Sequence, residues 1–135
     1  RYQLPAAKVN RSDISACMLA EGALINRSEL KHSIIGLRSM IRADTKIEFS
    51  IMMGADFYES EKQLSQNARD GIPPIGIGCG CLIRQAIIDK NARIGDEVIL
   101  VNKDVVKHAD AENYSIRDYI IIVPKNAVIP SGTVI

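Results

Sequence analysis

The sequence predicts an all-β fold, a left-handed parallel β-helix of hexapeptide repeats with two extruded loops. Three observations predict it. Large aliphatic residues recur at nearly every sixth position, small or turn-forming residues often follow them, and aromatic residues make up only 4% of the chain. The hydrophobic residues, 47% of the 135, are rich in Ile and Val, which favour strands. A chain of this length can bury the core of one domain.

The aliphatic repeat runs through three blocks of the chain. Its members step by five or six residues, whereas an amphipathic helix needs steps of three and four and an ordinary strand needs steps of two. Antiparallel strands with this spacing would require a coincidence in every block. We therefore predict that each hexapeptide is a short strand and a corner, and that three of them form a triangular coil around a shared core. The predicted inward residues are Leu19, Ile25, Leu30, Ile35, Ile41 and Ile47, then Ile77, Ile83, Ile88, Ile94 and Leu100, then Val123, Ile129 and Ile135.

Small or turn-forming residues follow several of these aliphatic residues and are expected to let the chain turn the corners. They are Gly36, Gly78, Gly95, Pro124 and Pro130. Successive coils should then lie about 4.8 Å apart, as strands do in a sheet.

Two polar segments interrupt the repeat. Residues 53–76 contain a Pro-Pro pair near their end, at 73–74, and their part 58–69 has the composition of a short helix. Residues 101–118 are charged and lack the six-residue period. We expect both to be loops extruded from corners, where a coil tolerates insertions. Residues 1–8 are expected to be the end of a linker, and residues 9–135 the β-helix domain.

Composition excludes several classes of function. A net charge of +1 gives no general attraction to nucleic acid or membranes, and no apolar run approaches the roughly 20 residues of a membrane span. The three cysteines, Cys17, Cys79 and Cys81, do not form a disulfide pattern and lack a second Cys or His pair for a metal, so a reducing compartment is expected. The chain opens at Arg1 without Met or a signal peptide, and we expect it to be a piece of a longer protein.

Catalytic motifs are sparse. The alternating glycines at 76–80 lie inside the repeat, and corner geometry explains them better than a phosphate-binding loop. Two histidines, His32 and His108, keep an alternative open, because small hexapeptide-repeat acyltransferases use a His as general base. Neither histidine has a visible partner. A structural β-helix without a ligand is a further alternative.

Lys90 and Lys125 are the most informative charged residues. Each lies two positions after an inward aliphatic residue, Ile88 or Val123. If segment 101–118 leaves the coil without changing its register, the two lysines stack about one strand spacing apart. Like charges placed opposite each other are destabilising, and an anion between them would relieve the repulsion. This pattern predicts a phosphate site, and the alternative is two solvated lysines.

Six motifs, in order along the chain, carry a resemblance to a known family. The chain resembles the C-terminal β-helix domain of ADP-glucose pyrophosphorylase, the glucose-1-phosphate adenylyltransferase of plants and cyanobacteria. The resemblance covers essentially the whole chain, and its most specific motifs are AIIDKNARIGD and MGADFYE. The motifs are HSIIGLRS (32–39), MGADFYE (53–59), PIGIG (74–78), AIIDKNARIGD (86–96), NKD (102–104) and IPSGTVI (129–135).

The resemblance implies a role in starch or glycogen synthesis. In this family an N-terminal domain converts ATP and glucose 1-phosphate into ADP-glucose and pyrophosphate, with Mg²⁺. The C-terminal β-helix helps to assemble a tetramer and to bind the activator 3-phosphoglycerate and the inhibitor phosphate. It implies a domain that is no enzyme by itself, without cofactor, metal or catalytic residues. The implied partners are the nucleotidyltransferase domain and other subunits, in the plastid stroma or the bacterial cytoplasm.

The family's effector-binding lysines match Lys90 and Lys125. Arg1 and Asp56 match positions near the family's effector site, and Asp89 lies beside Lys90. The resemblance thus implies that Arg1 supplies a bidentate phosphate contact, that Asp56 orients the cations, and that Asp89 supports them.

Overall fold

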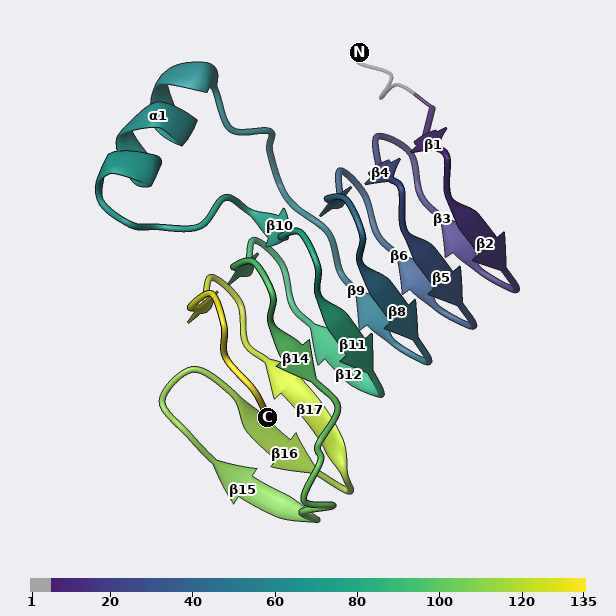
Figure 1. The fold of residues 1–135 in the computed structure, drawn as a ribbon, viewed down its shortest axis with the longest axis vertical. Coiled ribbons are helices and arrows are strands. Elements are labelled where there is room, and N and C mark those ends of the chain that lie inside the picture. The colour runs from purple at the N-terminus through teal and green to yellow at the C-terminus, as the bar shows by residue number, and fades with distance from the viewer. Residues whose placement is uncertain (1–5) are drawn as a thin grey trace.

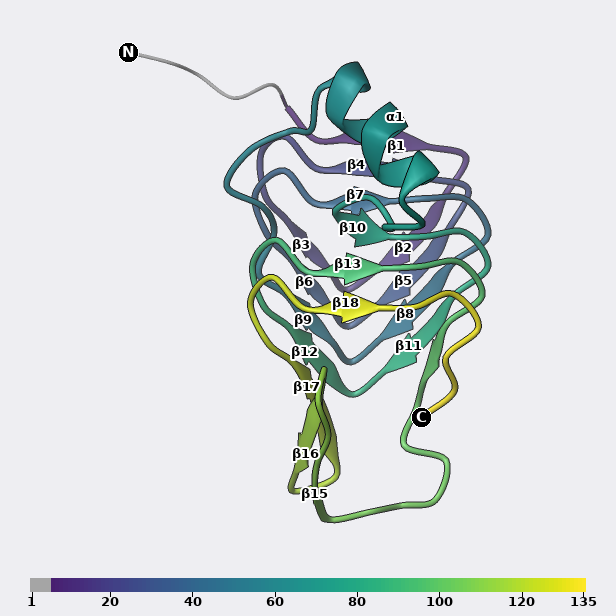
Figure 2. The ribbon, with the colours of Figure 1, turned by 90° about the vertical axis from the view of Figure 1, so that its left-hand side faces the viewer.

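The computed structural model describes residues 6–135 and is a β-helix of stacked triangular coils (Figures 1 and 2). Each coil contributes one short strand to each of three sheets, and neighbouring coils pair in parallel. Within these residues the one helix, α1, lies inside segment 53–76, as predicted. No helix of the described chain is long and apolar enough to cross a membrane. The predicted fold class is confirmed.

The three faces of the coil are named here sheets A, B and C. Sheet A contains β1 (Lys8–Asn10), β4 (Leu24–Asn26), β7 (Met40–Ile41), β10 (Gly76–Ile77), β13 (Arg93–Ile94) and β18 (Val128–Ile129). Sheet B contains β2 (Asp13–Ser15), β5 (Glu29–Lys31), β8 (Lys46–Glu48), β11 (Leu82–Arg84) and β14 (Ile99–Leu100). Sheet C contains β3 (Met18–Leu19), β6 (Ile34–Ile35), β9 (Ile51–Met52), β12 (Ala86–Ile88) and β17 (Ile120–Val123) in parallel, followed by β16 (Ser115–Arg117) and β15 (His108–Asp110).

The core is formed by the residues of the aliphatic repeat. On sheet A, for example, Ile41 pairs with Ile77, and Ile77 pairs with Ile94. Most of the predicted inward residues are at most 2% exposed, while Leu19 and Ile135 at the two ends are only partly buried. Removing this many aliphatic side chains from water is the main driving force of the fold.

Close packing between coils, more than backbone conformation, explains the predicted corner glycines. A Cβ atom on Gly36, Gly78 or Gly95 would overlap atoms of the next coil, such as the carbonyl oxygen of Met53 or the side chain of Ser131. The left-handed conformation at the corners is instead adopted mostly by other residues, for example Asn91, with a φ of 60°. Glycine is therefore required at these three positions because the backbones of adjacent coils approach closely there.

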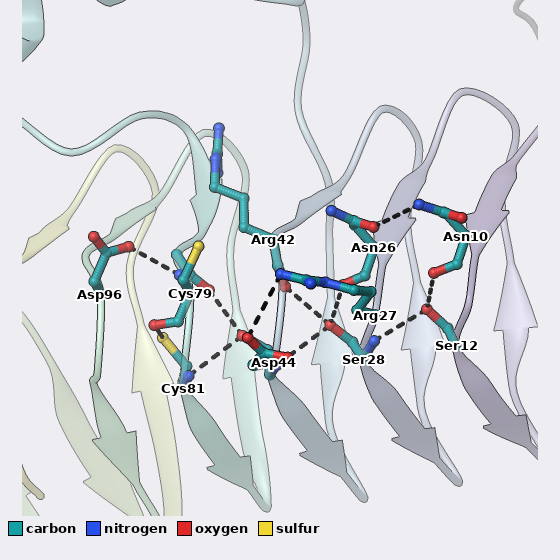
Figure 3. A network of polar contacts seen from close by, with 12 residues as sticks. Asn10, Ser12, Asn26, Arg27, Ser28, Arg42, Asp44, Cys79, Cys81 and Asp96 are labelled. Atoms are coloured by element: carbon teal, nitrogen blue, oxygen red, sulfur yellow. Dashed lines mark hydrogen bonds and ion pairs between the residues drawn. The ribbon is translucent and has the colours of Figure 1, made fainter.

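Hydroxyl groups connect the coils at the corner between sheets A and B (Figure 3). Ser28 receives a hydrogen bond on Oγ from the Thr45 N–H at 3.3 Å and donates one to the Arg42 carbonyl at 2.9 Å. Thr45 in turn donates from Oγ1 to the Gly78 carbonyl at 2.8 Å. These side chains satisfy backbone groups that a corner removes from the sheet ladder.

Both interrupting segments contain regular structure. In segment 53–76, α1 (Glu61–Arg69) begins with a capping box between Ser60 and Gln63. In segment 101–118, β15 and β16 form an antiparallel hairpin that continues sheet C beyond β17, which the sequence had not indicated. β1 begins at Lys8, one residue before the predicted start of the domain. The parallel register of β17 with β12 is the one expected across segment 101–118.

Candidate anion-binding site

The two candidate lysines lie at the corner between sheets C and A, on adjacent coils. Ile88 pairs with Val123, so the corner residues that follow them are in register. The Asn126 N–H donates to the Lys90 carbonyl at 3.0 Å. Lys90 and Lys125 are both exposed, and the prediction that they occupy equivalent positions on neighbouring coils is confirmed.

Asp56 reaches the same corner from the preceding coil. Its Oδ1 lies 3.2 Å from the Nζ of Lys90, and its Oδ2 accepts a hydrogen bond from Nδ2 of Asn91 at 3.0 Å. The Asp56 N–H also donates to Oδ1 of Asn91 at 2.9 Å, which closes a ring of two hydrogen bonds. The hydrogen bond from Asn91, followed by that from Lys90, lowers the pKa of Asp56, and the charges of Lys90 and Lys125 lower it further.

The side chain of Asp89 contacts the backbone of the corner rather than an ammonium group. Its Oδ1 accepts a hydrogen bond of 2.6 Å from the N–H of Lys90, which holds the backbone of the corner in place. Within residues 6–135, Lys125 has no carboxylate within ion-pair distance. Four of the five predicted site residues therefore meet at one corner, while Arg1 lies outside the described residues.

Asn91 is the residue of this corner that the sequence reasoning missed. It is buried and fixes both the backbone and the carboxylate of Asp56. The sequence holds a signal for it, because a Lys-Asn dipeptide occurs at 90–91 and again at 125–126. Asn tolerates the left-handed conformation that each corner needs, and Asn126 adopts it with a φ of 63°. The repeated dipeptide marks the same corner on two coils.

The anchoring of segment 53–76 places Asp56. Glu59, whose side chain is 4% exposed, accepts hydrogen bonds from Arg93 at 2.9 Å and from the Ile75 N–H at 2.6 Å. The Tyr58 hydroxyl donates to the Gly22 carbonyl at 2.7 Å. These contacts hold the segment against the outer side of sheet A, next to the candidate site.

The histidines and cysteines occupy other places. His32 stacks on Phe49 with ring centroids 5.0 Å apart, and His108 lies 3.9 Å from Asp118, an exposed pair. Burial raises the pKa of Cys81, while Cys79 is exposed and its N–H donates to Asp96 (Figure 3). Within residues 6–135, no three His, Cys, Asp or Glu side chains cluster as metal ligands would.

Two comparisons with known proteins identify the family. The model of the GLGC left-handed parallel β-helix domain matches residues 1–134. The chloroplastic/amyloplastic small subunit of glucose-1-phosphate adenylyltransferase from Triticum aestivum is 45% identical over 134 residues. This match covers 98% of the present chain but only 28% of the Triticum aestivum protein. Both findings confirm the resemblance indicated by the motifs, and the family model also confirms the left-handedness of the coil. The chain belongs to the family of GLGC left-handed parallel β-helix domains.

Proposed function

We propose that this chain is the regulatory and oligomerisation domain of a glucose-1-phosphate adenylyltransferase, and that it helps to bind 3-phosphoglycerate as activator and phosphate as inhibitor. The observation that carries the proposal is the position of Lys90 and Lys125 at one corner on adjacent, paired coils. The parent enzyme would convert ATP and glucose 1-phosphate into ADP-glucose and pyrophosphate.

The geometry suits a tetrahedral anion. Two ammonium groups that start from backbones about one strand spacing apart can both reach the oxygens of one phosphate group. Such hydrogen bonds are charge-assisted and roughly twice as strong as neutral ones. The anion would also remove the repulsion between the two cations. Arg1 would add a bidentate contact from the linker side.

Nucleotidyl transfer is assigned to the rest of the parent enzyme. The chain spans less than a third of the length of its Triticum aestivum relative, which is named as an adenylyltransferase subunit. We propose that an N-terminal nucleotidyltransferase domain carries the catalytic residues and the Mg²⁺. The chloroplastic/amyloplastic name of that relative supports a plastid location.

The outer face of sheet C supports the assembly role. Its outward residues form one paired row of apolar side chains, Met18, Ile34, Ile51, Ile87 and Ile122. Beside this row a hollow of about 610 Å³ is lined by residues that include Phe49, Val105 and Tyr119. Sheet B has charged residues outside instead, such as Glu29 and Lys46. A contiguous apolar face of this kind is typical of a surface that another protein covers, and we assign it to contacts with the other subunits of a tetramer.

The effector role is tested by replacing Lys90 and Lys125 with Ala, singly and together, in the full-length parent. Each replacement should raise the concentration of 3-phosphoglycerate needed for half-maximal activation. The double variant should lose less than the sum of the two singles, because both lysines serve one ligand. Lys31→Ala, an exposed lysine on sheet B, is the matched control. Unchanged activation of the double variant would place the effector site elsewhere.

A further inference from the structure

Asp56 forms an ion pair with Lys90, one of the two cations that the proposed anion site needs. Its carboxylate lies 3.2 Å from the Nζ of Lys90, and both side chains are about half exposed. An anion that approaches Lys90 from solvent therefore meets an ammonium group that already has a carboxylate partner. This contact distinguishes Lys90 from Lys125, which has no such partner among residues 6–135.

The backbone around Asp56 is fixed by the coil. The Met53 N–H donates to the Ile88 carbonyl at 2.8 Å, and the Asn91 N–H donates to the Gly54 carbonyl at 3.1 Å. The Ala55 N–H donates to the Leu37 carbonyl at 2.8 Å. Asp56 follows directly, and its own N–H is bound by Asn91. Its carboxylate therefore stays within reach of Lys90, and the pair separates by rotation of one of the two side chains rather than by movement of the backbone.

The formal charges of the four site residues at this corner cancel, while the Arg38 guanidinium, bonded at 3.0 Å to the carbonyl just before Asp56, adds a positive charge nearby. Lys90 and Lys125 carry two positive charges, and Asp56 and Asp89 carry two negative ones. Asp89 contributes by holding the Lys90 backbone N–H, whereas Asp56 contacts the ammonium group itself. A dianion bound here would face the Asp56 carboxylate at short range, where like charges repel.

From this arrangement we infer that Asp56 is an intramolecular competitor of the anion and sets the affinity and charge preference of the site. This inference rests on the proposed anion site at Lys90 and Lys125. It differs from the expectation that Asp56 orients the cations for binding. An orienting Asp56 strengthens binding, whereas a competing Asp56 weakens it, most of all for dianions. The two roles therefore predict opposite effects of Asp56→Asn.

The test is a sulfate titration of the 135-residue chain, followed through the backbone amide signals of Lys90, Asn91, Lys125 and Asn126. Sulfate remains a dianion near neutral pH, so its own protonation does not complicate the comparison. At low ionic strength, Asp56→Asn should tighten sulfate binding by roughly tenfold, because one negative charge next to the anion is removed. Asp44→Asn is the matched control. It removes one charge from the Arg27 pair at a different corner and should leave sulfate binding unchanged.

The outcomes separate the two ideas. Binding that is lost in the Lys90→Ala/Lys125→Ala double variant but unchanged or weaker in Asp56→Asn would overturn the inference and leave the anion site standing. Sulfate that shifts none of the four amides in either the wild type or Asp56→Asn would overturn the anion site itself. Dispersed amide spectra of every variant establish that each compared chain is folded.

Discussion

Glu59 anchors the inserted segment to the coil, and Glu59→Gln tests how much that anchor contributes. Its carboxylate accepts hydrogen bonds from Arg93, from the Ile75 N–H and from Nδ2 of Asn67. The side chains of Glu59 and Arg93 are 4% and 19% exposed. Gln has nearly the same shape but no charge. Its side-chain NH2 group donates hydrogen bonds, so it would face N–H donors where both carboxylate oxygens had accepted hydrogen bonds. Arg93 then keeps its charge in a mostly buried place, with the Pro73 carbonyl as a remaining acceptor.

The hydrogen bonds and burial of Glu59 set the loss of folding free energy expected for Glu59→Gln. Hydrogen bonds to a charged group contribute about 1.5–3 kcal/mol each, and they are not additive within one network. Removing one partner of a buried ion pair costs about 3–5 kcal/mol. Arg93 retains some access to water, so we expect the lower end, about 3 kcal/mol. The matched control is Glu48→Gln on sheet B, whose pair with Arg84 is 3.4 Å long and more exposed. That change should cost less than about 1 kcal/mol.

Urea unfolding followed by circular dichroism measures both free energies. Amide hydrogen exchange at Ile75 then shows whether the loss is local, because the Ile75 N–H should exchange faster if segment 53–76 detaches before the coil unfolds. The Glu59→Gln and Arg93→Met double variant should recover part of the loss, since no unpaired charge remains. Equal costs for Glu59→Gln and Glu48→Gln would refute the reasoning from burial.

Two further predictions concern the core and the pH dependence. Ile94→Asp places an unpaired carboxylate at a fully buried position, which costs several kcal/mol and should unfold the domain; Val128→Asp, on the outer side of the same sheet, should keep a folded circular dichroism spectrum. The pKa of Asp56 is lowered in the folded protein, so its ionised form stabilises the fold above the ordinary pKa of an aspartate, and this contribution is lost as the pH falls through the lowered value. Asp56→Asn should therefore be less stable than the wild type near neutral pH, and the difference should disappear in acid; a constant difference across urea titrations would contradict this.

The coil could be predicted because its cause is local and repeated. Each turn of the chain needs one aliphatic residue per side, and the six-residue period records that requirement directly. Val9, Ile14 and Met52 occupy the same rows, paired with Ile25, Leu30 and Ile88, although the sequence reasoning did not count them. The steps from Val9 to Ile14, from Ile14 to Leu19 and from Ile47 to Met52 are each five residues long. They fit the pattern once the first and third coils are recognised.

The hairpin and the Asn91 contact could not be predicted in the same way. The hairpin depends on the pairing of β16 with β17, and strands of three residues with a single apolar side chain each, Ala109 or Ile116, leave little periodic trace. Asn91 and Asp56 are 35 residues apart, and their contact exists because segment 53–76 returns to the same corner. Long-range contacts between inserted segments and coils depend on the three-dimensional path of the chain. The spacing of residues in a single sequence does not reveal that path.

The division between repeat and insertion explains the make-up of the candidate site. The positions two residues after the inward residue of sheet C form a column along the coil: Glu21, Leu37, Gly54, Lys90 and Lys125. The two cations occupy the last two places, and segment 53–76 leaves the coil at the place before them. The repeat thus fixes the spacing of the lysines, while the inserted segment supplies Asp56 beside them. Because Glu59 ties the same segment to Arg93, a change at Asp56 on anion binding would act on a segment anchored to two coils. A ligand shifts a protein between states only through such differential contacts, so the corner where repeat and insertion meet is where an anion bound at the proposed site would act on the fold.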